Sequence, residues 1–209
     1  MIRCVPPVML SCTGTCRKPP RQYNAVMSKP IVPSHADIVI IGGGIHGASL
    51  AFHLAEAKAG KIVLLEKRHL ASGPTSRSGA MVRPLFTQTV YVQLVSESTR
   101  MFESWRNRVG GESGFVQNGF LRITSSLEQT VIGGDLELTK ECGQPYEIFK
   151  AADLPGVAPT GTFNGQELGI LFPRGGYADP FATTVSLASS AERLGATIVE
   201  GVQVTGIET

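Results

Sequence analysis

The chain has 209 residues, of which 42% are apolar and 17% charged, and its formal net charge is +2. This composition excludes a largely disordered chain and provides apolar material for one or two folded domains. No apolar run approaches the ~20 residues that a membrane-spanning helix needs, so no membrane span is predicted.

The positive charge is concentrated in residues 1–35, which hold five basic side chains and no acidic one. Acidic groups therefore outnumber basic ones in the rest of the chain, which argues against nucleic acid as a partner. Three of the four cysteines also lie in this segment, which leaves Cys142 alone in the body. Since one cysteine cannot form an internal disulfide and no metal-ligand spacing is present, neither a disulfide framework nor a metal site is predicted.

Residues 1–35 are rich in proline and have neither helical nor strand periodicity, which predicts a disordered leader. Three interpretations of this leader stay open. The first is an organelle transit peptide, which would make the protein mitochondrial. The second is a lipoprotein signal that ends at Cys12. The third is that Met27 is the true start, in which case we expect a cytoplasmic protein.

The body opens with a pattern typical of a strand, a helix and a second parallel strand. The β-branched run 37–41 predicts a buried strand, and three glycines end it at 42–44. Residues 45–59 carry alanine and leucine at helical spacing, and residues 62–66 have the pattern of a second strand. Such a unit is a βαβ motif, whose crossover should be right-handed.

A stretch without regular period follows at residues 68–86, and long loops beside βαβ units are often functional. Residues 91–109 then carry apolar side chains at helical spacing, which predicts an amphipathic helix. We expect its apolar stripe, which starts at Tyr91 and Leu94, to lie in the core. Trp105 belongs to the same stripe and is interpreted as a core residue, not as part of a cofactor site.

The remaining segments alternate between strands and helices. Residues 115–124 have the pattern of strands around an Asn-Gly turn, and a weaker helix interrupted by two glycines follows. An apolar run at 168–172 predicts another strand. Asp179 and Pro180 are a strong helix start, because aspartate caps a helix and proline fits its first position. That helix leads to two strands within 197–207, and we expect the chain to be part of a longer protein.

The sequence Gly42-Gly43-Gly44-Ile45-His46-Gly47 fits the pattern G-x-G-x-x-G between the first predicted strand and helix. In that context the pattern predicts a dinucleotide site. Gly42 allows the tight turn, Gly44 lets the backbone approach a pyrophosphate, and Gly47 lets the helix pack closely on the strand. The helix N-terminus then offers N–H groups and the positive end of its dipole to the phosphates.

Glu66 ends the second predicted strand, 19 positions beyond Gly47. A carboxylate at this place accepts the ribose hydroxyls of a dinucleotide and repels a 2′-phosphate, which disfavours NADP. The glycine pattern does not separate NAD from FAD. That choice depends on the next loop, Thr75-Ser76-Arg77-Ser78-Gly79-Ala80-Met81-Val82-Arg83.

With this loop, the chain resembles the D-amino-acid oxidase superfamily of FAD-dependent oxidoreductases, above all sarcosine oxidases of the β-subunit type and dimethylglycine-dehydrogenase-like proteins. The similarity covers residues 37–209, which correspond to the N-terminal half of the family. It implies an α/β fold, in which a Rossmann-like FAD-binding domain is joined to part of a second, mixed α+β substrate domain. We expect four segments: the leader at 1–35, the FAD-binding region at 36–112, the substrate domain at 113–175 and a return to the FAD-binding domain at 176–209.

The resemblance also implies roles for individual residues. The ribose would lie on Glu66 with Lys67 beside it, and the adenine on the backbone of Val204. Arg83 stands where the family has an arginine near the substrate carboxylate, a task that suits the guanidinium fork. The alternative is a structural arginine paired with an acid. The pyrophosphate and flavin edge would lie along the glycine turn and the following loop, on Gly42, Gly43, Gly44, Ile45, His46, Gly47, Thr75, Ser76, Arg77 and Ser78.

The sequence departs from the family in two places. Some relatives attach FAD through a histidine in the loop 75–80, where Arg77 and its neighbours offer none. Others attach a second flavin through a histidine where this chain has Pro180. We therefore expect FAD to be bound non-covalently.

The implied activity is oxidation of an amine or N-methyl amino acid of the sarcosine type by hydride transfer to the flavin. Electrons would pass to oxygen, a quinone or a carrier flavoprotein, and no catalytic residue is assigned. Two alternatives stay open. One is an FAD-binding fragment or assembly-type protein without turnover, and the other is an NAD-dependent dehydrogenase.

Overall fold

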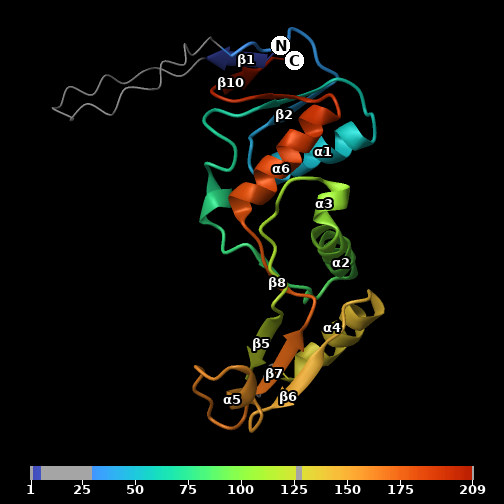
Figure 1. Ribbon diagram of the computed structural model, residues 1–209, viewed down its shortest axis with the longest axis vertical. Coiled ribbons are helices and arrows are strands. Elements are labelled where there is room, and N and C mark those ends of the chain that lie inside the picture. Colours follow the sequence, from blue (N-terminus) through green and yellow to red (C-terminus); the bar gives the residue numbers. More distant parts are fainter. Residues whose placement is uncertain (1, 6–29, 126–128, 209) are drawn as a thin grey trace, which may run out of the picture. The chain divides into compact units, whose positions relative to one another are not determined.

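The computed structural model describes residues 2–5, 30–125 and 129–208 (Figure 1). The chain divides into two compact units, one made of residues 1–77 and 187–209 and the other of residues 78–186. Each unit has its own sheets, so the two are described separately below.

In the first unit, the predicted strand–helix–strand pattern forms a parallel sheet with the order β2-β3-β9. The central strand β3 (Ile62–Leu65) is buried at all four positions, which explains its continuous apolar sequence. It lies between β2 (Ile38–Ile41) and β9 (Thr197–Val199). Helix α1 (Ile45–Glu56) connects β2 to β3 and buries Ala48, Ala51, Phe52 and Ala55.

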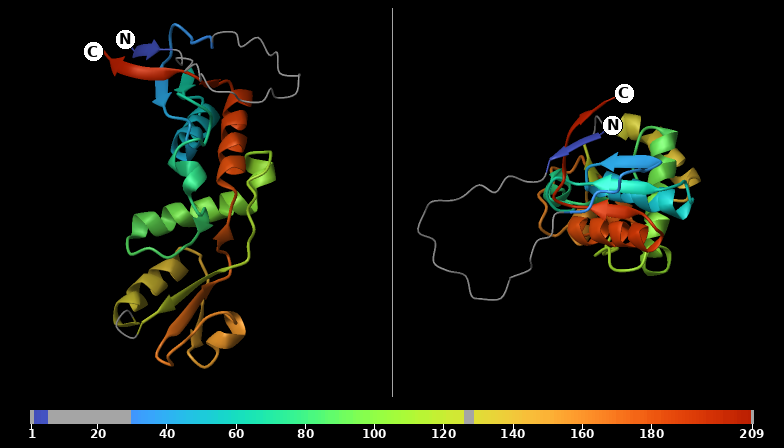
Figure 2. Two further views of the ribbon diagram at one scale, coloured as in Figure 1. Left: turned by 90° about the vertical axis from the view of Figure 1, so that its left-hand side faces the viewer. Right: turned by 90° about the horizontal axis from the view of Figure 1, so that it is seen from above.

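A second sheet in this unit pairs β1 (Ile2–Val5) with β10 (Gln203–Ile207) in antiparallel fashion (Figure 2). Residues 2–5 of the leader that was predicted to be disordered therefore form a strand, because β10 offers them backbone hydrogen-bonding partners. Cys12 and Met27, on which two interpretations of the leader rest, lie outside the described residues.

The second unit is built on an antiparallel sheet with the order β5-β7-β6. The middle strand β7 (Leu168–Phe172) lies between β5 (Phe120–Thr124) and β6 (Glu147–Lys150). Helix α4 (Gln129–Glu141) lies along one face of this sheet (Figure 1) and continues through its two glycines. The core between helix and sheet contains Leu136, Ile170 and Phe172, with Phe120, Leu85 and Tyr146 packed against them.

Two further elements complete this unit. A short antiparallel ribbon pairs β4 (Met81–Val82) with β8 (Gly176–Tyr177). The one-turn helix α5 (Leu154–Val157) lies between β6 and β7 in the sequence and buries Leu154.

The amphipathic helix predicted at residues 91–109 is divided into α2 (Thr89–Glu103) and α3 (Trp105–Arg108). The prediction of a core residue is confirmed for Trp105, which is 5% exposed and whose ring stacks on that of Phe102 at 5.2 Å between centroids.

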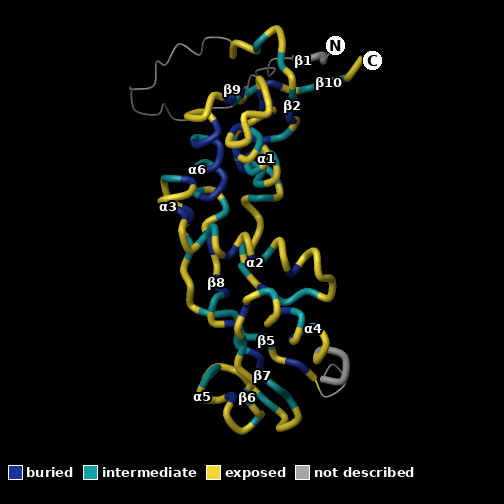
Figure 3. Tube along the Cα trace, turned by 90° about the vertical axis from the view of Figure 1, so that its right-hand side faces the viewer, coloured by how far each residue is buried: buried dark blue, intermediate teal, exposed yellow. Residues whose placement is uncertain are grey.

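At the other end of the stripe the prediction is wrong. Tyr91 and Leu94 are 50% and 59% exposed, and most of α2 lies at the surface (Figure 3). Helical spacing identified an apolar stripe but could not decide which face of the helix meets the rest of the protein. The buried face of α2 consists instead of Val92, Ser96 and Thr99.

Helix α6 (Pro180–Arg193) begins as predicted. Asp179 accepts hydrogen bonds at Oδ1 from the N–H groups of Phe181 and Ala182, at 2.8 and 2.9 Å. None of the helices in the described parts of the chain is long and apolar enough to cross a membrane.

Candidate functional site

The glycine turn lies between β2 and α1, where the sequence placed it. Gly42 has a φ of +107°, a conformation that favours glycine, and its N–H donates to the carbonyl oxygen of Leu65 at 2.8 Å. A Cβ atom at Gly47 would lie 2.0 Å from the carbonyl oxygen of Gly42. Only glycine at position 47 therefore lets α1 begin this close to the end of β2.

Glu66 follows β3 and is 9% exposed. Its Oε2 accepts a hydrogen bond from the Gly43 N–H at 2.7 Å, and its Oε1 accepts one from the Arg68 N–H at 2.8 Å. The carboxylate thus ties the glycine turn to the loop after β3, a link that the motif spacing did not predict. Each carboxylate oxygen has a further lone pair, which is compatible with the predicted contact to ribose hydroxyls.

The loop after Glu66 reaches the glycine turn at two points. Thr75, in the 3-10 helix η1 (Pro74–Arg77), accepts a hydrogen bond at Oγ1 from the N–H of Ile45 at 3.1 Å. Ala71 is buried with a φ of +58°, and its N–H donates to the carbonyl oxygen of Gly43 at 2.9 Å. Thr75 therefore lies at the N-terminus of α1, the place where the resemblance puts a pyrophosphate.

The N-terminus of α1 fits an anionic cofactor group. Its N-cap is Gly44, which has no side chain to cap the helix, and the first turn holds no acidic residue. The first-turn N–H groups and the positive end of the helix dipole are thus free of a competing carboxylate of this helix. A Cβ atom at Gly44 would lie 3.0 Å from Thr75 Oγ1, so any larger side chain would occupy this space.

The other loop residues predicted to bind the cofactor are exposed. Ser76 donates from Oγ to the carbonyl oxygen of Gly73 at 3.0 Å. Ser78 accepts at Oγ from the Ala80 N–H at 3.0 Å. Both serine side chains therefore form hydrogen bonds with backbone groups two or three residues away in the same loop. Lys67, Arg77 and His46 are exposed as well.

Val204 lies in β10, and its backbone pairs with that of Cys4 in β1. Its side chain packs against an apolar cluster that includes residues of β3 and β9. Since this pairing involves the backbone expected to meet adenine, the adenine contact stays a prediction. The cluster consists of Val63, Leu65, Val199 and Val202.

Arg83 belongs to the second unit and directly follows β4. It is exposed, and its Cζ lies 5.1 Å from the ring centroid of Phe86. Within the described residues, no carboxylate forms an ion pair with Arg83. Whether Arg83 binds a ligand therefore stays a prediction.

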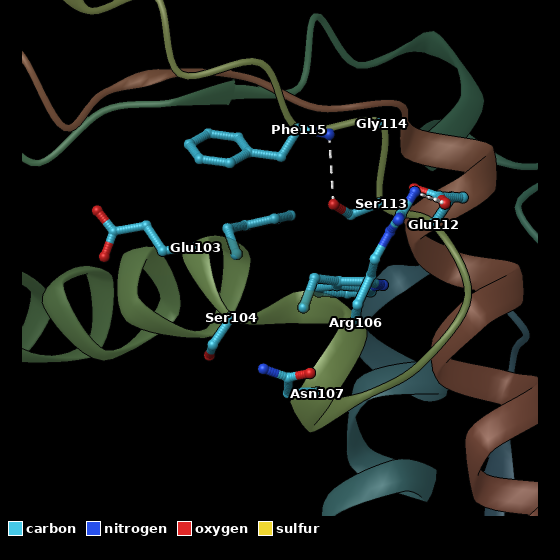
Figure 4. A pocket seen from close by; sticks show the side chains of 10 residues that line it. Glu103, Ser104, Arg106, Asn107, Glu112, Ser113, Gly114 and Phe115 are labelled. Carbon is cyan, nitrogen blue, oxygen red and sulfur yellow. Dashed lines mark hydrogen bonds and ion pairs between the residues drawn. The ribbon is translucent and has the colours of Figure 1, made fainter.

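The second unit also contains a cavity of about 290 Å³ beside α3 (Figure 4). At its rim, Arg106 forms an ion pair with Glu112. None of the residues predicted to bind the cofactor or substrate lines this cavity. Its lining is Phe102, Glu103, Ser104, Trp105, Arg106, Asn107, Glu112, Ser113, Gly114 and Phe115.

A polar cluster in this unit was missed by the sequence reasoning. Arg174 donates from Nε and Nη2 to the two carboxylate oxygens of Glu103 at 2.9 and 2.6 Å, and from Nη1 to the carbonyl oxygen of Gly143 at 2.8 Å. The hydrogen bond from Arg174 holds the pKa of Glu103 below its ordinary value of 4.5. Glu103 and Arg174 are 71 positions apart, so no local pattern could have paired them.

A parallel sheet with a glycine turn at the start of its first helix, joined to a unit with an antiparallel sheet, defines a dinucleotide-binding enzyme fold. The chain belongs to the DAO family of FAD-dependent oxidoreductases, which it matches over residues 37–209. The predicted family resemblance and fold class are confirmed: this is a Rossmann-like FAD-binding domain with part of a mixed α+β substrate domain.

The proteins that this chain is similar to include amine and amino-acid dehydrogenases. Human mitochondrial sarcosine dehydrogenase is 31% identical over 182 residues, which are 86% of this chain and 20% of that protein. Mouse mitochondrial dimethylglycine dehydrogenase is 28% identical over 182 residues, or 87% of this chain and 21% of that protein. The crystal structure of L-proline dehydrogenase from P. horikoshii matches with a TM-score of 0.75 and 27% identity over 84% of this chain and 46% of that one. The chain thus spans about a fifth of the length of these two curated relatives.

Proposed function

We propose that the protein is an FAD-dependent oxidoreductase that oxidises an amine or N-methyl amino acid of the sarcosine type. The observation that carries this proposal is the cradle formed by the glycine turn, Glu66 and Thr75, in a chain of the DAO family. Relatives named for sarcosine, dimethylglycine and L-proline support an N-alkylated amino acid as substrate.

The residues proposed to hold the cofactor belong to the first unit, except Ser78, which opens the second. The N–H groups at the start of α1 would bind the pyrophosphate, and Glu66, with Lys67 beside it, would accept the ribose hydroxyls. The loop from Thr75 to Ser78 would border the flavin, and the backbone of Val204 would contact the adenine. When bound, FAD supplies a hydride acceptor, which is chemistry that no amino-acid side chain provides.

In the second unit, Arg83 would bind the substrate carboxylate. Its guanidinium can donate two parallel hydrogen bonds, and the face of Phe86 beneath it restricts its orientation. No covalent attachment of FAD is proposed, because the loop that carries an attaching histidine in some relatives has Arg77 and serine here. Oxygen, a quinone or a carrier flavoprotein would take the electrons.

Anaerobic titration of the purified yellow protein tests this proposal. Sarcosine, N,N-dimethylglycine and L-proline should each be added separately, and the flavin absorbance near ~450 nm, a property of the cofactor itself, should be followed. Bleaching by one of them is expected, while the same amine without a carboxylate should bleach far more slowly. Retention of FAD without bleaching by any amine would instead favour a flavin-binding protein without turnover. A colourless protein that binds NAD would contradict both.

The cellular location is a separate proposal. We propose the mitochondrion, because two of the relatives are named as mitochondrial proteins. The cytoplasm is the alternative. Fusion of residues 1–35 to a fluorescent reporter tests it. Import of the reporter into mitochondria is expected, and a diffuse cytoplasmic signal would contradict it.

A further inference from the structure

We propose that Met81 and Tyr177 set the size of the apolar group that the substrate carries beside its carboxylate. This inference rests on the proposed function, in which Arg83 binds that carboxylate. All of the residues involved belong to the second unit.

Three apolar side chains form a row across the short ribbon of this unit. Met81 of β4 is the register partner of Tyr177 of β8. On the other side of Tyr177, Val116 forms an antiparallel bridge, with Val116 N–H donating to the Tyr177 carbonyl oxygen at 2.8 Å and the reverse bond at 3.2 Å. Directly opposite residues of antiparallel strands have their side chains on the same face of the sheet. The three side chains therefore share one face.

This row is exposed to an extent that is unusual for large apolar side chains in one place. Met81 is 65% exposed, Tyr177 47% and Val116 44%. Exposing several neighbouring apolar side chains to water is unfavourable. Surfaces of this kind commonly bind a ligand or a partner. Tyr177 can also offer a hydroxyl, because its oxygen makes no hydrogen bond with the described residues.

Arg83 places a cation close to this row along the chain. It directly follows β4, two residues beyond Met81, and both side chains are exposed. The ring of Phe86 beneath the guanidinium is itself packed against Tyr91, with 6.0 Å between ring centroids. The guanidinium is thus oriented by aromatic contacts, and its N–H groups stay available.

The surface defined by Arg83, Met81, Tyr177 and Val116 is complementary to one kind of small molecule. A carboxylate pairs with the guanidinium, and aliphatic carbon next to the carboxylate covers the apolar row. An N-alkyl amino acid has both features, whereas a diamine has no anionic group for the guanidinium and inorganic phosphate has no aliphatic carbon for the apolar row. We therefore infer that the row selects among carboxylate substrates by their apolar size.

Binding of unreactive carboxylates tests this selection without any turnover. Acetate, propionate and butyrate are titrated calorimetrically into the FAD-loaded protein. For the unmodified protein we expect affinity to rise about fourfold with each added methylene group, the value for burial of one such group. In Met81→Ser and Tyr177→Ser this rise should fall below about twofold, since the apolar surface that covers the added carbon has been removed.

The controls separate this inference from the proposed function. Ile148→Ser, on β6, removes an apolar side chain of similar exposure (54%) and should leave the rise per methylene unchanged. Arg83→Gln should weaken all three carboxylates by a similar factor. A rise that is unchanged in both Met81→Ser and Tyr177→Ser, or the absence of carboxylate binding to the unmodified protein, would overturn the inference. Flavin bleaching by amino acids decides the proposed function independently of either result.

Discussion

Replacement of Gly47 by alanine tests the close approach of α1 to β2. The added Cβ atom would lie 2.0 Å from the carbonyl oxygen of Gly42 and 3.4 Å from Cγ2 of Ile40. An ordinary C···O contact is roughly 3.3 Å long, so the start of α1 would have to move by more than about 1 Å. No rotamer change can relieve this contact, because both atoms are fixed by the backbone.

Two opposing contributions decide the magnitude. Alanine favours the helix over glycine by about 1 kcal/mol. Overpacking a close-packed site typically lowers the free energy of unfolding by about 1–3 kcal/mol. We take the upper end of this range, because the added Cβ atom meets backbone, which cannot move aside easily. We expect a net loss of about 2 kcal/mol in the free energy of unfolding. FAD affinity should fall at least ~10-fold, because the donors at the start of α1 move with the helix.

Urea denaturation gives the first quantity, and quenching of flavin fluorescence on binding gives the second. Gly73→Ala is the matched control, since a Cβ atom there has no neighbour within 4 Å. If Gly47→Ala retained both the urea midpoint and the FAD affinity of the unmodified protein, the role assigned to this glycine would be refuted.

Three further predictions concern the cofactor site and the second unit. Glu66→Ala leaves the Gly43 and Arg68 N–H groups without their acceptor, so the free energy of unfolding measured in urea should fall by about 1–3 kcal/mol. Glu66→Gln keeps one acceptor oxygen and should lower it by less. Equal losses in the two variants would contradict the hydrogen bonds assigned. Acid precipitation should release all flavin into the supernatant, and a yellow washed pellet would reveal a covalent link. Because Arg174 lowers the pKa of Glu103, the stability contributed by this pair is present above pH 4.5, the ordinary value, and is lost as the pH falls through the lowered one. The stability difference between the unmodified protein and Glu103→Gln should therefore shrink in acid, and a difference independent of pH would argue against this ion pair.

The accuracy of the sequence-based predictions follows the range of the interactions involved. The glycine turn, the capped start of α6 at Asp179 and the buried strand β3 were all identified correctly. Each depends on neighbours within a few positions, through positive φ, capping or a continuous apolar run. The sequence also placed Glu66 at the end of the second strand of the βαβ unit, and it directly follows β3. Its contact with ribose stays a prediction.

Other features depend on contacts between distant segments. The apolar spacing of α2 predicted burial of Tyr91 and Leu94, but the helix buries its other face. Periodicity gives the angular position of a stripe and contains no information about what lies opposite it. The pairing of Arg174 with Glu103, 71 positions away, was equally beyond any local pattern.

The amino-acid sequence alone thus predicted the class of fold and the place of the glycine turn, since glycines and strand periodicity over about 30 neighbouring positions encode a βαβ unit. The family followed from the resemblance of its motifs. Only the tertiary structure decided that Glu66 and Thr75 converge on the same turn, because their hydrogen bonds to Gly43 and Ile45 join residues 23 and 30 positions apart. It alone brought Met81, Tyr177 and Val116 into one row. The pairing of strands brings side chains from distant segments to one face, and it follows from the register of the strands, which no single segment specifies.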